Sequence, residues 1–160
     1  MIKVTIDTDK LSIAVNKLLA CLKQFETILV KESEQLKASD TETLRKTTVE
    51  KDTIATEIET VFAELKTITN DISFSINDFM SQDLFKDLPL ELQASFEKTV
   101  NQIVICHDKN IANGISLQAL SNINHAFLQL FKGQDPHSKT YTASGNTTPS
   151  NSTSKTLGKA

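Results

Sequence analysis

The sequence of 160 residues has no tryptophan, only four glycines and three prolines, and a single arginine. So few glycines and prolines give little material for tight turns, which disfavours a β-rich fold and favours an all-helical chain. No run of eighteen apolar residues occurs, and the first residues lack the basic and apolar segments of a secretory signal. We therefore expect a cytoplasmic protein without direct membrane insertion.

Charge is distributed unevenly between the body of the chain and its end. Residues 1–132 carry 14 basic and 19 acidic residues, a net charge of −5, whereas residues 133–160 carry three lysines and one aspartate. Nucleic-acid affinity depends largely on clustered basic side chains that replace counterions on phosphates. An acidic body without such a cluster therefore disfavours nucleic-acid binding.

Side chains that support catalysis or metal binding are sparse. Cys21 and Cys106 both fall in apolar rows, where isolated cysteines are more often small core residues than a disulfide or a metal site. His107 and Asp108 are adjacent, so on a helix they point about 100° apart and cannot form a base with its orienting carboxylate. Phosphate-binding glycine-rich loops, nucleophile elbows and Glu-x-x-His pairs are absent. The sequence predicts no enzymatic activity, no metal site and no cofactor.

Hydrophobic periodicity predicts three helices. In the first, apolar residues are spaced alternately by four and three, Glu32 fills the one missing place, and Asp7, Thr8 and Asp9 are candidate caps. The apolar seam of this helix consists of Leu11, Val15, Leu18, Leu22, Phe25, Leu29 and Leu36.

The second helix is predicted to begin at Ser39, which has capping-box spacing to Glu42. Beyond about Asn70, serine, asparagine and β-branched residues lower the helix propensity. The predicted seam is Leu44, Thr48, Lys51, Ala55, Ile58, Phe62, Leu65, Thr69, Ile72, Ile76 and Phe79, with Ile54, Val61 and Ile68 beside it.

The third helix is predicted to be the longest. Residues 81–88 are typical of a connection, and Pro89 suits the first helical position, where its missing donor is unsatisfied anyway. A helix from there to about Gly133 is about 60 Å long at 1.5 Å per residue. Its seam is Leu92, Phe96, Thr99, Ile103, Cys106, Asn110, Asn113, Leu117, Leu120, Asn124, Phe127 and Phe131.

These helices and their short connections predict an all-α fold, an elongated antiparallel three-helix bundle with a long third helix. The helical domain is expected at residues 1–135, followed by a flexible Ser/Thr-rich tail at residues 136–160. Residues 139–160 contain ten serines and threonines, with Tyr141 and Leu157 as the only sizeable apolar side chains. Such a segment cannot bury enough surface to offset its ordering entropy, so it is predicted to be disordered.

The pentad Asn110–Gly114 interrupts the amphipathic pattern of the third helix. A glycine in a helix costs about 1 kcal/mol, and carboxamides on a packed face need partners. In a structural interpretation, Gly114 admits a close neighbouring helix while Asn110 and Asn113 fix the helix register, as buried asparagines do in coiled coils. In a functional interpretation, the two carboxamides bind a partner segment. The sequence favours the structural interpretation, because register-setting asparagines are well attested.

A second candidate surface follows the pentad. It is ordinary core if the first two helices cover it, and a recognition surface for another amphipathic helix if it projects. Its apolar residues are Leu117, Leu120, Phe127, Leu128 and Phe131.

Three stretches of the chain resemble the FlgN-type flagellar export chaperone family, and they keep the family's order. They are Glu32-x-x-x-Leu36 followed by Leu44 and Glu50-Lys51, then Asn110-x-x-Asn113-Gly114, and last Tyr141-Thr-Ala-Ser-Gly145. Thr142 stands where the family's tail motif, Tyr-Gly-x-x-Gly, has its first glycine.

The resemblance implies an all-helical, monomeric or weakly dimeric chaperone without ATPase activity. Such a chaperone binds the C-terminal helical segment of hook-filament junction proteins, blocks their premature assembly and delivers them to the export gate of the flagellar type III secretion apparatus. Tyr141 then docks on the cytosolic domain of the gate protein FlhA. The candidate cargo contacts are Asn110, Asn113, Gly114, Leu117, Leu120, Asn124, Phe127 and Phe131.

Two other kinds of protein are compatible with long amphipathic helices. One is a homo-oligomeric structural coiled coil without cargo, whose mass depends on concentration. The other is a helical-bundle metalloprotein, which retains a transition metal after purification.

Overall fold

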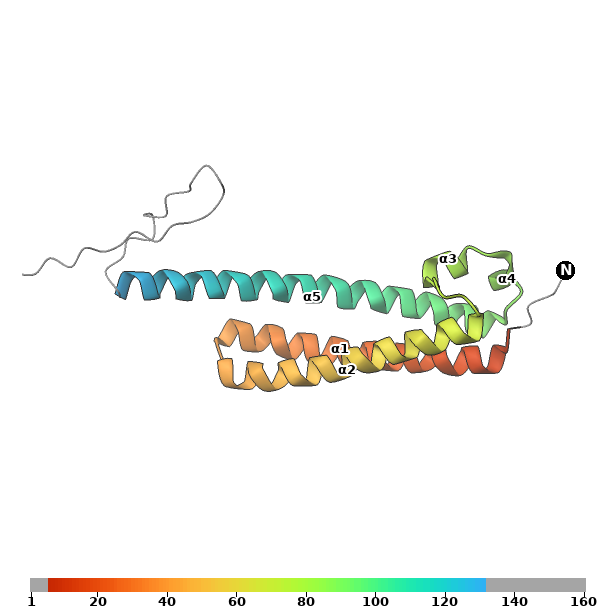
Figure 1. Ribbon diagram of the computed structural model, residues 1–160, viewed down its shortest axis with the longest axis horizontal. Coiled ribbons are helices and arrows are strands. Elements are labelled where there is room, and N and C mark those ends of the chain that lie inside the picture. Colours follow the sequence, from red (N-terminus) through yellow and green to blue (C-terminus); the bar gives the residue numbers. More distant parts are fainter. Residues whose placement is uncertain (1–5, 132–160) are drawn as a thin grey trace, which may run out of the picture. The chain divides into compact units, whose positions relative to one another are not determined.

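The computed structural model describes residues 6–131, apart from the side chains of residue 127 and residues 129–131. Regular structure in this range is entirely α-helical, which confirms the predicted all-α class (Figure 1). The chain divides into two units, residues 1–116 and residues 117–160. The predicted tail at residues 136–160 lies outside the described residues. The helices are α1 Thr8–Ala38, α2 Thr41–Thr69, α3 Ile76–Met80, α4 Asp83–Lys86 and α5 Leu90–Phe131.

Helix α1 follows the sequence pattern closely. Asp7 is its N-cap and accepts a hydrogen bond from the Lys10 backbone amide at 3.1 Å, which lowers the pKa of the Asp7 carboxyl. The predicted seam is buried except for Phe25, which is half-buried. Glu32, in the place where the apolar pattern lapses, is buried as well. The buried residues of α1 are Leu11, Ala14, Val15, Leu18, Cys21, Leu22, Leu29, Glu32 and Leu36.

The connection between α1 and α2 is short, and the predicted capping box at Ser39 and Glu42 is wrong. Ser39 instead ends α1 in the left-handed region, at φ 54°, and its amide donates to the last carbonyls of that helix. Asp40 caps α2, since its carboxylate accepts from the Thr43 amide at 3.1 Å. Hydrogen bonds from Thr43 lower the pKa of the Asp40 carboxyl. The hairpin is therefore joined by two residues only.

Helix α2 ends at Thr69, so the predicted continuation to Phe79 is wrong. Asn70 adopts the left-handed conformation at φ 53°, which asparagine tolerates better than most residues. Within α2, Leu65 of the predicted seam is buried, and so are Ile54 and Val61, which were predicted to lie beside the seam, whereas the rest of the seam is not buried. The buried residues of α2 are Thr47, Ile54, Val61 and Leu65.

An aromatic cluster closes one end of the first unit. Phe79 and Phe85, from the segment between α2 and α5, contact Phe96 of α5, and Phe74 contacts Phe79. The rings of Phe79 and Phe85 each lie with their centroids 5.4 Å from that of Phe96. Residues 81–88, predicted as a plain connection, thus contain the short helix α4 and contribute Phe85 and Leu88 to the core.

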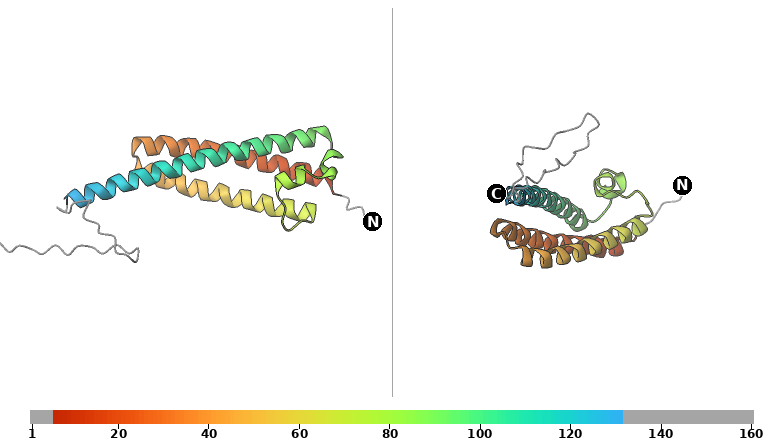
Figure 2. Two further views of the ribbon diagram at one scale, coloured as in Figure 1. Left: turned by 90° about the horizontal axis from the view of Figure 1, so that it is seen from above. Right: turned by 60° about the vertical axis from the view of Figure 1, so that its left-hand side comes forward.

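Helix α5 begins at Leu90, one residue later than predicted, and the carbonyl oxygen of Pro89 accepts from the amides of Leu92 and Gln93. Its 42 residues correspond to about 63 Å. Within the first unit α1 and α2 run antiparallel, as the ion pairs Lys17–Glu64 and Lys31–Glu50 require. Figure 2 shows these two helices side by side, with α3 and α4 near the start of α5.

Candidate functional site

A buried polar cluster joins the three long helices. Lys51 of α2 donates to both carboxylate oxygens of Glu32 in α1, at 3.1 and 3.0 Å. The side-chain amide of Asn113 in α5 donates to Glu32 Oε2 and to the Leu29 carbonyl oxygen, both at 2.8 Å. Glu32 is 8% exposed and Asn113 is 5% exposed. Satisfied in this way, a buried carboxylate fixes where α2 and α5 lie along α1.

A second set of polar contacts lies one heptad earlier on α1 and α5. The Cys106 thiol donates to the Leu22 carbonyl oxygen at 3.2 Å, so Leu22–Cys106 and Leu29–Asn113 share one register. Glu26 accepts a hydrogen bond from Gln102 at 2.6 Å and lies 3.8 Å from the Lys109 ammonium. Helix α5 therefore runs parallel to α1 in the first unit.

Both cysteines are buried and reduced, in agreement with the prediction that they are core residues. Burial raises the pKa of the Cys21 and Cys106 thiols, and Gln102 partly opposes the shift at Cys106. Raised thiol pKa values keep the sulfurs protonated, and buried thiols are unreactive. In residues 6–131, no three His, Cys, Asp or Glu side chains are grouped so that they could hold a metal ion.

The structure separates the members of the Asn110–Gly114 pentad. Asn113 points into the bundle and Asn110 is exposed, so the two carboxamides do not act on one surface. The placement of Asn113 corresponds to the structural interpretation of a register-fixing asparagine. The structural interpretation of Gly114 is wrong, because a Cβ atom added there would meet nothing within 4 Å. Helix packing inside the chain gives no reason for a glycine at this position.

The remaining predicted contacts lie in the second unit. Leu117 is 49% exposed, Leu120 is half-buried and Asn124 is exposed. Phe127 and Phe131 belong to α5, but their side chains lie outside the described residues, as does Tyr141.

Sequence analysis missed other exposed apolar residues on the outer sides of α5. The sequence does contain a signal for these residues, because large apolar residues occur on all sides of α5 rather than along one stripe. Such a distribution is typical of a helix with more than one packed face. Outside the predicted row, these exposed residues are Leu90, Val104, Ile105, Ile111, Ile115 and Ile123.

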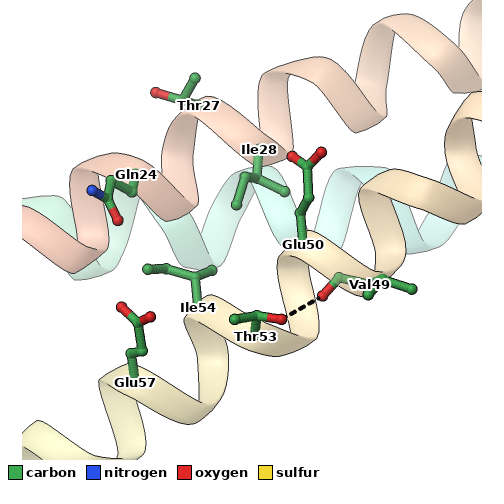
Figure 3. Close-up of a pocket in the computed structure, with 8 residues that line it drawn as sticks. All are labelled: Gln24, Thr27, Ile28, Val49, Glu50, Thr53, Ile54 and Glu57. Atoms are coloured by element: carbon green, nitrogen blue, oxygen red, sulfur yellow. Dashed lines mark hydrogen bonds between the residues drawn. The ribbon is translucent and has the colours of Figure 1, made fainter.

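Pockets also lie on helices of the first unit. A pocket of about 510 Å³ lies between α1 and α2, where Ile28 and Ile54 lie between the two helices, with Glu50 and Glu57 beside them (Figure 3). The Thr53 hydroxyl at its wall donates to the Val49 carbonyl oxygen at 3.0 Å. A second pocket of about 250 Å³ is lined by residues of α2, α3 and α5, among them Phe62, Ile76 and Ile103. Across the described residues, every helix is too short or too polar to cross a bilayer.

Comparisons with known proteins identify one family. The sequence model of the family described as FlgN protein matches residues 1–149, nearly the whole chain. No curated protein and no solved structure matches the chain.

Proposed function

Because the chain belongs to the FlgN family of flagellar export chaperones, we propose that it binds the C-terminal helical segment of hook-filament junction proteins in the cytoplasm. Bound in this way, the segment cannot assemble prematurely, and the complex is delivered to the export gate. The cargo surface is the C-terminal part of α5, with Leu117, Leu120 and Asn124 among its described residues. Phe127 and Phe131 continue the same row in the sequence.

The observation that carries the proposal is the length of α5. Helix α5 has 42 residues, whereas α1 has 31 and α2 has 29, so the hairpin cannot cover α5 from end to end. Within the first unit, the contact between Leu29 and Asn113 pairs α1 with α5 in parallel from their starts. In the second unit, the exposed Leu117 belongs to an apolar row of α5 that is suited to an amphipathic cargo helix.

The energetics suit a chaperone that must release its cargo. A segment that becomes ordered on binding spends part of its contact energy on that ordering, so the net affinity is smaller than the contact area suggests. Tyr141, in the Ser/Thr-rich tail, then adds a weak second contact with the gate protein FlhA. Such a contact raises the effective concentration of the chaperone–cargo complex at the gate although the contact itself is weak.

Replacing Leu117 by serine is expected to weaken binding of the junction-protein segment about fivefold, because truncating an interface contact typically costs about 1 kcal/mol. The full chain is titrated with the purified segment by isothermal calorimetry, and light scattering follows the mass. Ile115→Ser is the matched control, since Ile115 is also exposed but, two residues before Leu117, lies about 160° around α5 from it. A one-to-one complex and a fivefold loss confined to Leu117→Ser support the proposal. Growth in mass of the chain alone with concentration, without cargo binding, supports the homo-oligomeric alternative.

Replacing Tyr141 by alanine is expected to weaken capture by the FlhA cytosolic domain at least tenfold, since the tail has no other aromatic anchor. Affinity for cargo and helical content should stay unchanged. Surface plasmon resonance on immobilised FlhA domain measures the first, and circular dichroism the second. Loss of cargo binding in this variant would contradict the proposal that Tyr141 contacts FlhA while α5 contacts the cargo.

A further inference from the structure

The inner side of α2 is only partly covered by the rest of the chain. The heptad pattern predicts a packed seam through Ala55, Ile58 and Phe62, yet these residues are half-buried, whereas Ile54 and Val61 beside them are buried. A regular apolar row normally has a partner along its whole length. Ile58 and Phe62 pack against the core but, like Ala55, keep part of their surface accessible.

A matching row runs along α5. Ile103, His107, Asn110 and Gly114 are spaced by four, three and four residues, which places them on one face of the helix. Burial falls along this row, since Ile103 is half-buried and the other three are exposed.

Contacts within the first unit bring the two rows close at both ends. At one end the pocket of about 250 Å³ is lined by Phe62 of α2 and Ile103 of α5. At the other end Lys51 of α2 and Asn113 of α5 bind the same Glu32 carboxylate. The row on α2 and the row on α5 are therefore close to each other at both ends.

Helix α3 shows what kind of group this space accepts. Ile76 of α3 is buried and lines the pocket between α2 and α5, so a helix already occupies the start of the space. Helix α3 has only five residues and leaves the rest without a helical neighbour. At the far end, Gly114 has open space where a side chain would be, which permits close approach by another backbone.

We propose that the face between α2 and α5 binds an amphipathic helix of the exported cargo, which takes the fourth position of the bundle next to α3. The eleven steps from Ile103 to Gly114 correspond to about 16 Å, or about three turns of the bound helix. That helix presents apolar side chains to Ile58 and Ile103 and polar ones to Asn110, with its closest approach at Gly114. This inference rests on the proposed function and adds a second contact region for the same cargo.

The test uses the full chain and the fluorescently labelled C-terminal segment of a hook-filament junction protein. Gly114→Leu adds a bulky side chain on the α5 side of the face, and Ala55→Glu adds a carboxylate on the α2 side. Each variant is expected to weaken binding of the segment at least tenfold. The matched controls are Asn101→Leu on α5 and Ala63→Glu on α2, at exposed positions away from this face. Both controls should bind within twofold of the unmodified chain.

Folding is checked in the same samples. Gly114→Leu should raise the midpoint of thermal unfolding, because leucine is a better helix former and the site is open. Weaker binding by a variant that is more thermostable therefore cannot come from unfolding.

The outcomes separate the two proposals. If Gly114→Leu and Ala55→Glu bind like the unmodified chain while Leu117→Ser binds more weakly, the face between α2 and α5 is not a cargo site and the proposed function stands. If the unmodified chain does not bind the segment, the proposed function fails and this inference fails with it.

Discussion

Replacing Phe96 by alanine is expected to lower the free energy of unfolding by about 4 kcal/mol, a large part of the stability of a domain of this size. Phe96 is 0% exposed and lies at the centre of the aromatic cluster that ties the segment between α2 and α5 to the helices. Its removal leaves a cavity that neighbouring rings cannot fill without leaving their own positions. Urea denaturation followed by circular dichroism measures the loss.

Phe25→Ala is the control for this prediction. Phe25 lies in the seam of α1 but is half-buried, so its truncation should cost clearly less than that of Phe96. Equal losses would show that the cluster around Phe96 adds nothing beyond ordinary seam packing.

Replacing Glu32 by alanine is expected to lower the free energy of unfolding by about 3 kcal/mol, because removing one partner of a buried ion pair leaves the other uncompensated. Lys51 loses both of its carboxylate contacts, and the Asn113 amide keeps only the Leu29 carbonyl. Urea denaturation of Glu32→Ala and Lys51→Ala and of the double variant gives the coupling energy between the two.

The chain supplies a matched control one residue away. Lys31 and Glu50 form an ion pair at 3.1 Å between the same two helices, but both side chains are about half exposed. Glu50→Ala is therefore expected to cost less than about 1 kcal/mol. A similar loss for Glu32→Ala would contradict a special role for the buried cluster.

Local sequence signals predicted the parts of the fold that depend on periodicity. The seam of α1 followed from apolar spacing, and its cap Asp7 is one of the three candidates that the sequence offered. The long α5 followed in the same way, with its start within one residue of Pro89. Such features are determined by residues that are close together in the sequence.

Features set by long-range packing were not predictable. The end of α2 at Asn70 and the short helices after it depend on the aromatic cluster of Phe74, Phe79, Phe85 and Phe96. These contacts join residues far apart in the sequence, so hydrophobic periodicity does not predict them. The sequence also favours the wrong cap for α2, because serine and aspartate both cap helices well and only the structure of the connection decides between Ser39 and Asp40.

The candidate site was predictable residue by residue but not as an arrangement. Glu32, Lys51 and Asn113 each broke an apolar pattern, which marked them in the sequence. That all three meet requires the register between the helices, which the pattern alone leaves open. The difference between Asn110 and Asn113 depends on the same register, since three residues turn a helix by about 300°.

The two connections of the first unit differ in a way that bears on motion. Only Ser39 and Asp40 join α1 to α2, and so short a connection restricts movement of these two helices relative to each other. Helix α5 is tethered through residues 70–89, a much longer segment with two short helices of its own. Because buried Phe79 and Phe85 of this segment hold the start of α5 at Phe96, a bound helix that widens the molecule should change hydrogen exchange first in parts of α2 and α5 away from this cluster.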